Sequence, residues 1–423
     1  NQNILLPSKL PSFMSRLKNI KEIRLEISDG VDSYRCQILK ILKSFQHFRK
    51  LERLEIIIKH KKYLFKNITP ILSKVSNQKN FKELDIEFNT QAVDNLTDLF
   101  YEMAEFNKKV SNIHAVRIYS SMFNGADISE FDMLVKSLNK VQTLKELSFE
   151  ISTRAYPSKI LSILDKGPIL ERLYLYLETL EGFGGKIGSA FLSLASLKFL
   201  SIEIETFDTL ESNPKDKEGI MKGFQALTNL EELEVYWTDR DWYDSGILSY
   251  LWGDKPKLRA LQINGGVKHR VPEFLQHHSH VAKICEYGHQ PVWSPSEHKR
   301  SQYIANCMKS LSQSTPLREL KLCLYAVKIG DDVMEVLGTW FETMKDIEVL
   351  ELRTTKDMIT SKGVINLTNG ISKLIKLRDL WIELEGFSIT HGLKELLQAI
   401  LMSMKTRDVI FKIEFTKMLK EYN

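Results

Sequence analysis

Leu51-Glu52-Arg53-Leu54-Glu55-Ile56 and Phe81-Lys82-Glu83-Leu84-Asp85-Ile86 are two copies of one six-residue pattern that decides the fold of this chain. The pattern is an apolar residue, usually two charged residues, then leucine, any residue and a second apolar residue. Twelve clear copies occur along the 423 residues, and their fourth positions mostly lie 26 to 33 residues apart. The other ten begin at Ile20, Ile113, Leu144, Leu170, Leu197, Leu230, Leu258, Leu317, Ile347 and Leu377. A repeat of this period predicts a solenoid whose units pack against their neighbours.

Each copy predicts a short strand followed by a helix. The fourth and sixth residues are apolar, so their side chains share one face of a strand. Apolar residues at helical spacing follow the strands, for example from Val333 to Phe341, after the helix-entry pair Asp331-Asp332. Strands stack about 4.8 Å apart whereas packed helices need about 8–10 Å, so the stack is expected to bend with the strands on its concave side.

These long repeats with helices resemble the ribonuclease-inhibitor-like class of leucine-rich repeats over nearly the whole chain. The resemblance implies an α/β solenoid, shaped as a horseshoe, with a parallel sheet on the concave face, helices on the convex face and about 14 repeats. Most family members carry Asn or Cys at the ninth position, and here only Asn89 does, which indicates a divergent member. The Lys-, Asn- and Ile-rich composition is similar to that of leucine-rich repeat proteins from ciliate protists.

The repeats predict a single domain over residues 1–423. Residues 1–19 are expected to form an N-terminal cap, and residues 404–423, including Val409–Ile413, a C-terminal cap. The gap between Leu261 and Leu320 is twice the usual period, so residues 265–310 are expected to hold an irregular repeat with an insertion, centred on Val281–Ile284.

Composition favours an intracellular protein, most simply a cytoplasmic one. No apolar run reaches the roughly 18 residues that a membrane helix needs, and the first residues lack the features of a secretory signal. The four cysteines form no CxxC pair and are expected to be reduced thiols. The chain does not begin with methionine, so residues upstream of Asn1 remain open.

Positive charge concentrates near the N-terminus. Residues 1–118 hold 21 Lys and Arg against 13 Asp and Glu, although the whole chain carries only +5. This excess predicts a binding site for an acidic or phosphate-rich partner, which could be RNA, an anionic membrane or an acidic protein tail. The alternative is that these residues form a solvated charged edge that binds no partner. The candidate residues are Lys40, Lys43, Arg49, Lys50, Lys59, Lys61 and Lys62.

The concave face is the other candidate surface. At the fifth and seventh motif positions nine residues are acidic and four basic, which predicts a negative face. Exposed Tyr and Trp are common anchors of protein interfaces, although aromatic residues also simply favour strands. The predicted partner-binding residues are Tyr119, Tyr174, Tyr176, Glu203, Glu234, Tyr236, Trp242 and Tyr243.

Catalytic and cofactor motifs are not found in the sequence, so neither an enzyme nor a bound cofactor is predicted. The Gly182–Lys186 segment lacks the spacing of a phosphate-binding loop. Six histidines lie near Cys285, but their spacing matches no zinc signature, and no metal is predicted. These histidines are His269, His277, His278, His280, His289 and His298.

A non-catalytic scaffold for protein–protein interaction is the function that these features favour, in the form of a structural or accessory subunit of a larger assembly. Two alternatives stay open. Members of this repeat class also act as regulatory adaptors, such as ubiquitin-ligase substrate receptors or GTPase regulators. The basic N-terminal end could instead associate with RNA or a ribonucleoprotein.

Overall fold

The computed structural model describes residues 19–28, 43, 45, 48–59, 65–90, 104–110, 112–120, 133, 136–151, 161, 164, 169–179, 184–206, 214–237, 255–265, 317–324, 330–357, 359–386 and 410–416. The chain forms two compact units. Unit 1 comprises Asn1–Glu178 and Ser189–Leu197, and unit 2 comprises Thr179–Gly188 and Lys198–Asn423. The single domain over 1–423 and the horseshoe shape of the whole chain stay predictions.

Unit 1 contains a parallel sheet whose strands are neighbours in chain order. Helix α3 (Phe65–Ser76) connects the second strand to the third. The strands are β1 (Glu22–Ser28), β2 (Arg53–Lys59), β3 (Glu83–Thr90), β4 (Ile113–Ser120), β5 (Glu146–Ile151) and β6 (Arg172–Thr179). Each strand contains the third to sixth positions of one copy of the sequence motif.

Unit 2 repeats this order with seven described strands. They are β7 (Phe199–Thr206), β8 (Glu232–Trp237), β9 (Ala260–Gly265), β10 (Glu319–Leu324), β11 (Val349–Asp357), β12 (Asp379–Gly386) and β13 (Ile410–Thr416). Its described helices are α8 (Pro214–Ala226), α12 (Asp331–Phe341) and α13 (Ser361–Ser372), and the residues of α7 (Gly184–Leu192) are divided between the two units. Strand β13 lies within the segment predicted to form the C-terminal cap.

The long gap in the repeat period does not place a strand between β9 and β10. Ala260 pairs directly with Glu319, and Gly265 with Leu324. The degenerate repeat expected around Val281–Ile284 lies outside the described residues. The irregular repeat with an insertion over residues 265–310 therefore stays a prediction.

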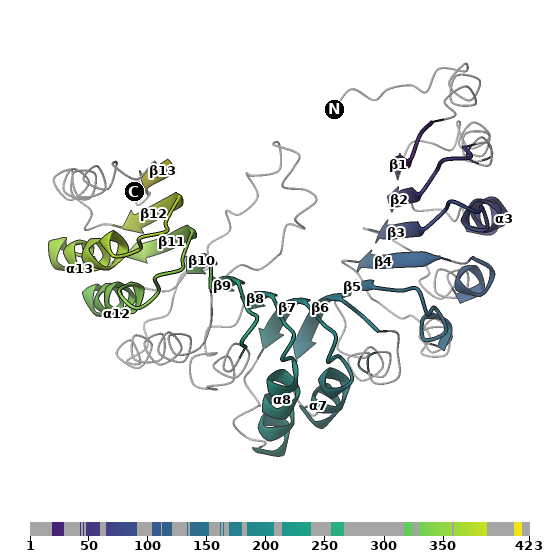
Figure 1. Ribbon diagram of the computed structural model, residues 1–423. Helices are drawn as coiled ribbons and strands as arrows, with labels where there is room; N and C mark the ends of the chain where they lie inside the picture. The colour runs from purple at the N-terminus through teal and green to yellow at the C-terminus, as the bar shows by residue number, and fades with distance from the viewer. Residues whose placement is uncertain are drawn as a thin grey trace, which may run out of the picture. The chain divides into compact units, whose positions relative to one another are not determined.

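The helices of each unit lie on one side of its strands (Figure 1). The fourth and sixth motif residues point to that side and form the core: Leu54, Ile56, Leu350 and Leu352 have no exposed surface. Burying one such side chain contributes about 1.5–3 kcal/mol. This arrangement confirms the predicted α/β leucine-rich repeat architecture. We call the opposite side of each sheet, which the helices do not cover, its open face.

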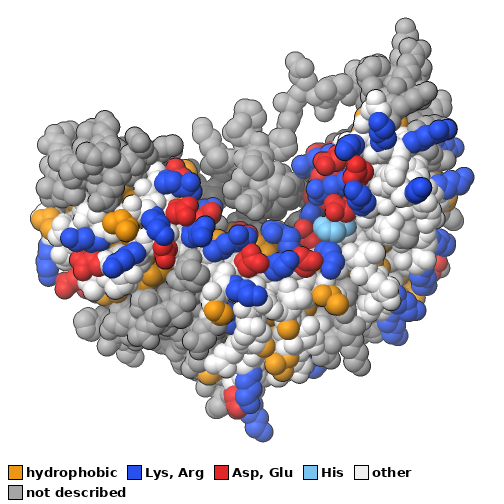
Figure 2. All heavy atoms as spheres, viewed as in Figure 1, with side chains coloured by type: hydrophobic (Ala, Val, Ile, Leu, Met, Phe, Trp, Pro, Cys, Tyr) orange, Lys and Arg blue, Asp and Glu red, His pale blue; other side chains and the backbone are white. Residues whose placement is uncertain are grey.

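The two charged motif positions have a structural explanation. The carbonyl of the second residue accepts backbone N–H groups from the second and third residues of the next repeat, as Lys21 does from Glu52 (2.7 Å) and Arg53 (3.0 Å). Side chains at the second position therefore lie beside one another, and their charges alternate in places. Glu52 pairs with Lys21 and with Lys82 on either side of it. Lys and Arg side chains lie among Asp and Glu side chains in Figure 2.

Candidate interaction surface

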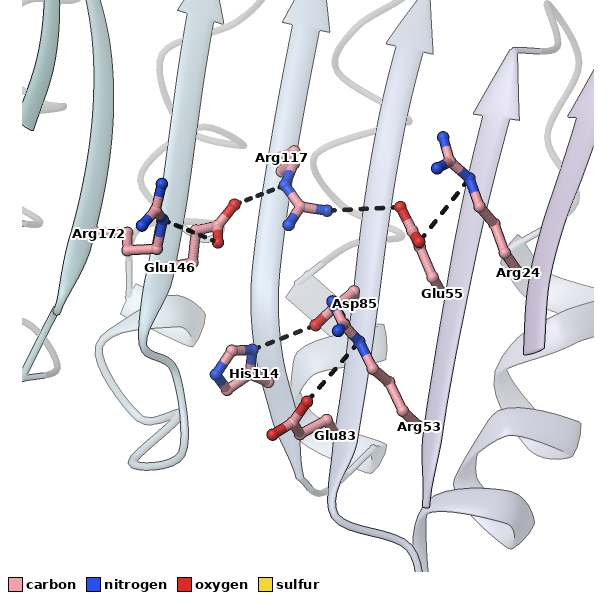
Figure 3. A network of polar contacts seen from close by, with 9 residues as sticks. All are labelled: Arg24, Arg53, Glu55, Glu83, Asp85, His114, Arg117, Glu146 and Arg172. Atoms are coloured by element: carbon pink, nitrogen blue, oxygen red, sulfur yellow. Dashed lines mark hydrogen bonds and ion pairs between the residues drawn. The ribbon is translucent and has the colours of Figure 1, made fainter. Parts of the chain in front are cut away.

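Five charged side chains from five strands form a chain of ion pairs across the open face of unit 1 (Figure 3). Arg117 lies at its centre: its Nε is 2.6 Å from Glu146 Oε1 and its Nη1 is 3.9 Å from Glu55 Oε1. Arg24 Nε lies 3.8 Å from Glu55 Oε2, and Arg172 Nε lies 3.7 Å from Glu146 Oε2. Arg117 and Glu146 are the least exposed members, so their mutual orientation is fixed by packing as well as by charge.

A second group surrounds Asp85, whose side chain has no exposed surface. Arg53 donates two hydrogen bonds to Asp85 Oδ2, from Nη2 at 2.6 Å and from Nε at 3.1 Å. His114 Nδ1 lies 3.3 Å from Asp85 Oδ1, and Glu83 lies 3.7 Å from Arg53 Nε (Figure 3). A buried carboxylate is stable only when it is paired and hydrogen-bonded, and these cationic neighbours meet that need.

A register shift between β3 and β4 brings His114 to this position. Leu84 pairs with Ile113 but the next residue, Asp85, pairs with Ala115, so His114 is an extra residue in the ladder. Asn112, just before the strand, has a φ of 59°, a left-handed conformation that asparagine tolerates better than most residues. Beyond this point the motif positions of β4 to β6 are displaced by two residues relative to those of β1 to β3.

The third motif position was not among those predicted to contribute to the concave face. Because side chains alternate along a strand, this position shares the open face with the fifth and seventh. It supplies Arg53, Glu83, Glu146 and Arg172 to the two groups. The alternation of side chains along a strand was enough to predict that the third position lies on the open face. The position of His114 could not be predicted in this way, because it depends on the register shift between β3 and β4.

Ion pairs neutralise part of the negative charge that was predicted for the concave face in unit 1. Third, fifth and seventh positions of β1 to β6 with described side chains hold seven carboxylates and four guanidinium groups, and the guanidinium groups each contact one or more carboxylates. The carboxylates are Glu22, Glu26, Glu55, Glu83, Asp85, Glu87 and Glu146. Four of the seven carboxylates thus lie in ordered ion pairs, while the face still carries more carboxylates than guanidinium groups.

The pKa values of the central pair shift in opposite directions. Burial alone would raise the pKa of the Asp85 carboxyl, but hydrogen bonds from His114 and Arg53 outweigh it and hold that pKa below its usual value. The hydrogen bond to Asp85 raises the pKa of His114, against the effect of burial, and the charges of Glu83 and Glu146 act in the same direction. His114 therefore keeps its proton to a higher pH than a free histidine does.

Replacing His114 by glutamine is expected to cost more stability at pH 5.5 than at pH 8.5. A raised pKa contributes stability that is fully present below the unfolded value of 6.5 and is lost as pH rises through the folded value. The lowered pKa of Asp85 does not change this comparison, because the stability that it contributes is lost only as pH falls below about 3.8. Urea unfolding of the wild type and of His114→Gln at pH 5.5 and pH 8.5 measures the difference in their free energies of unfolding. An equal difference at the two pH values would contradict the ion pair.

Two predicted partner-binding tyrosines adjoin this network on β6. Tyr174 and Tyr176 are both half-buried on the open face. Arg172 Nη2 donates a hydrogen bond to the Tyr174 hydroxyl at 3.1 Å, and its guanidinium lies 6.0 Å from the centre of the Tyr174 ring. Tyr174 is therefore held in place by the same arginine that pairs with Glu146.

The predicted residues of unit 2 form a separate polar group. Tyr236 is half-buried on β8; its hydroxyl accepts a hydrogen bond from Gln262 Nε2 at 3.1 Å and lies 3.5 Å from Glu234 Oε2. Glu203, opposite Tyr236 on β7, is only 6% exposed. Tyr236 and Glu234 thus present surface to a partner, while the Glu203 carboxylate presents little.

A further cluster on the open face of unit 2 was not among the predicted site residues. The Arg353 guanidinium lies 3.8 Å from the centre of the Trp381 ring and pairs with Glu351 and Glu383. The neighbouring Cys323 is buried, and burial raises the pKa of its thiol to about 12. A thiol with so high a pKa is inert at neutral pH.

Of the predicted basic residues, Lys43, Arg49 and Lys50 are exposed. Lys59 lies on β2 and Tyr119 on β4, but their side chains fall outside the described part of the chain. The other predicted positions that lie outside the described residues are Lys40, Lys61, Lys62, Trp242, Tyr243 and the six histidines from His269 to His298.

Within the described ranges, His, Cys, Asp and Glu side chains do not gather in any group of three or more that could hold a metal ion. A search of the same residues finds no helix with the length and apolar character needed to cross a membrane.

Comparisons with known proteins find similarity to solved structures at low sequence identity. No protein-family model matches the chain, and no curated protein matches it. The chain is similar to the leucine-rich repeat-containing protein LegL7 from Legionella pneumophila, with 13% identity, a TM-score of 0.41, and coverage of 87% of this chain and 95% of that one. It also matches the carboxyl transferase domain of Rhizobium etli pyruvate carboxylase at 12% identity and a TM-score of 0.18, covering 59% and 46%. The class of fold, a leucine-rich repeat solenoid, rests on the repeats and strands of this chain itself.

Proposed function

We propose that the protein is a non-catalytic interaction scaffold, acting as a structural or accessory subunit of a larger assembly, and that it holds a protein partner on the open face of unit 1. The observation that carries this proposal is the row of half-buried Tyr and Arg side chains on that face, held by ion pairs. Tyr and Arg are enriched among residues that dominate binding energy in protein interfaces.

Preorganisation is the physical reason to favour this face. Binding normally costs conformational entropy when side chains at an interface become fixed. Here Arg172 is held by Glu146 and itself holds Tyr174, so part of that cost is already met in the free protein. Tyr119 of β4 is proposed as part of the same contact area in unit 1. Tyr236 and Glu234 of unit 2, together with the predicted residues Trp242 and Tyr243, are proposed as a second contact area.

Replacing Tyr174 and Tyr176 together by alanine is expected to reduce recovery of the partner about tenfold, because truncating hot-spot tyrosines commonly costs more than 1 kcal/mol. The measurement is affinity purification of the tagged chain from its native cells, followed by quantitative mass spectrometry.

The matched control is the double variant Ile169→Ala and Leu192→Ala. Both residues are exposed, at 68% and 58%, and lie in the helix and turn segments of unit 1 away from the open-face positions. The control should recover the partner as well as the wild type does. Equal recovery by all three proteins would contradict a role for the open face.

The identity of the recovered partner separates the scaffold from the adaptor alternatives. Stable, stoichiometric subunits of one assembly would support the scaffold. Recovery of ubiquitin-ligase subunits, or of a small GTPase bound in only one nucleotide state, would assign a regulatory role to the same surface instead.

A further inference from the structure

A second surface of unit 1 is built from the turns that lead from each helix into the next strand. Nine exposed Lys and Arg residues lie in or beside these turns, and Glu105 is the acidic residue that pairs with two of them. Figure 2 shows Lys and Arg side chains gathered over the part of the molecule that carries α3 and the first strands. We call this surface the basic rim: Lys43, Arg49, Lys50, Lys74, Lys79, Lys108, Lys109, Lys136 and Lys140.

Successive turns of the basic rim are tied together by side-chain hydrogen bonds, so its charges occupy one continuous surface although they lie about 30 residues apart in sequence. These bonds run from Asn80 Nδ2 to the Arg49 carbonyl (2.7 Å), from Ser73 Oγ to the Lys109 carbonyl (2.9 Å) and from Asn107 Nδ2 to Ser137 Oγ (3.0 Å). Of the basic rim, only Lys43, Arg49 and Lys50 were among the predicted basic residues.

Helix capping does not account for the basic rim. Lysine near a helix C-terminus interacts favourably with the helix dipole, and Lys74 lies in the last turn of α3. The four described helices α7, α8, α12 and α13, however, have no basic residue in their last turns. In unit 2 the turn after α12 carries Glu342 and Asp346 beside Lys345. The fold therefore does not require lysines at these positions.

The chemistry of the basic rim favours phosphate over protein as its ligand. Between the lysines lie polar residues such as Asn77, Gln78 and Gln142. The exposed large apolar residues of unit 1, Ile169 before β6 and Leu192 on α7, lie outside the residues of the basic rim. A protein interface normally needs apolar or aromatic anchors. Contacts to a nucleic-acid backbone are instead made by Lys, Arg, Asn, Gln, Ser and Thr.

In the described part of these turns no aromatic ring is exposed, which favours duplex over single-stranded nucleic acid as the ligand. Phe45, Phe48, Phe81 and Phe106 are the aromatic residues of the described turns, and all four are buried. Proteins that bind single strands stack bases on exposed aromatic side chains, whereas duplexes can be held through the phosphates alone.

We propose that the basic rim binds the phosphate backbone of double-stranded nucleic acid without reading its sequence. Lysine suits this role because its ammonium is a flexible point charge that does not demand bidentate geometry. The surface is separate from the open face, so the inference stands or falls independently of the proposed function. Duplex RNA and duplex DNA share the phosphate chemistry and are distinguished by the test.

The test is fluorescence anisotropy of the full chain with labelled 24-base-pair duplex RNA, the corresponding DNA and one single strand, between about 50 and 200 mM salt. A fourfold variant removes one charge from each turn: Lys50→Gln, Lys79→Gln, Lys109→Gln and Lys140→Gln. It is expected to bind duplex about tenfold more weakly, and the slope of log affinity against log salt should fall by about four.

The matched control removes the same number of positive charges from unit 2 through Lys222→Gln, Lys257→Gln, Lys345→Gln and Lys373→Gln. It should retain the affinity of the wild type and the same slope of log affinity against log salt. Circular dichroism confirms folding of both variants, and the wild-type salt slope tests the proposal even if a variant misfolds. The proposal is overturned by a flat wild-type salt response, by equal losses in both variants, or by single strand bound as tightly as duplex. Preference for polyglutamate or phosphatidylserine vesicles over both duplexes also overturns it.

Discussion

Replacing Gly370 by alanine is expected to weaken the contact between α12 and α13 by about 2 kcal/mol. A Cβ atom at Gly370 would lie 2.1 Å from the Gly338 carbonyl oxygen, which is backbone and cannot move aside cheaply. Overpacking of this kind costs about 3 kcal/mol, and the better helix propensity of alanine returns about 1 kcal/mol. Hydrogen exchange of α12 and α13 amides should accelerate about thirtyfold, since 1.36 kcal/mol is a factor of ten.

Gly185→Ala is the matched control, because it makes the same change within α7 where nothing lies within 4 Å of the new Cβ. Helix propensity alone then applies, so this variant should be neutral or stabilised by up to about 1 kcal/mol. Opposite signs for the two substitutions are the expected result. Equal, small effects would mean that the helices of neighbouring repeats do not approach as closely as the structure shows.

Replacing Asp85 by alanine is expected to destabilise unit 1 by about 2 kcal/mol. Breaking a buried ion pair costs about 3–5 kcal/mol, and we take a lower figure because Arg53 and His114 are about a third or more exposed and can be solvated. The loss combines three hydrogen bonds with the packing of β3 against β2 and β4. Urea unfolding monitored by circular dichroism measures the change.

Glu52→Ala provides the comparison for Asp85. Glu52 also pairs with two cations, Lys21 and Lys82, but these pairs lie at the exposed edge of the sheet. Surface ion pairs contribute little to stability, so this variant should be clearly less destabilised than Asp85→Ala. Similar losses for the two carboxylates would show that burial does not distinguish the Asp85 group from an ordinary surface pair.

The sequence motif predicted the strands, their order and their core residues, because burial on one side of a strand imposes period two on every repeat. The fourth and sixth positions, such as Leu320 and Leu322, are buried as expected. The direct pairing of β9 with β10 could not be predicted, since the motif does not say whether a long gap holds another strand.

The candidate surfaces were predicted only in part. Tyr174 and Tyr176 followed from their motif positions, but the partners that hold them depend on which residues of neighbouring strands face each other. That register changes between β3 and β4, where His114 is an extra residue between Ile113 and Ala115. The basic rim was missed beyond Lys50 because its lysines lie on separate repeats and become neighbours only when the repeats stack.

Photo-crosslinking from the open face tests the central claim most directly. The chain would carry p-benzoylphenylalanine in place of Tyr176, and in a second protein in place of Leu192, which is exposed on α7. The account predicts a covalent adduct with one protein partner from position 176 and none from position 192. An adduct formed from position 192 alone would contradict binding of the partner to the open face of unit 1.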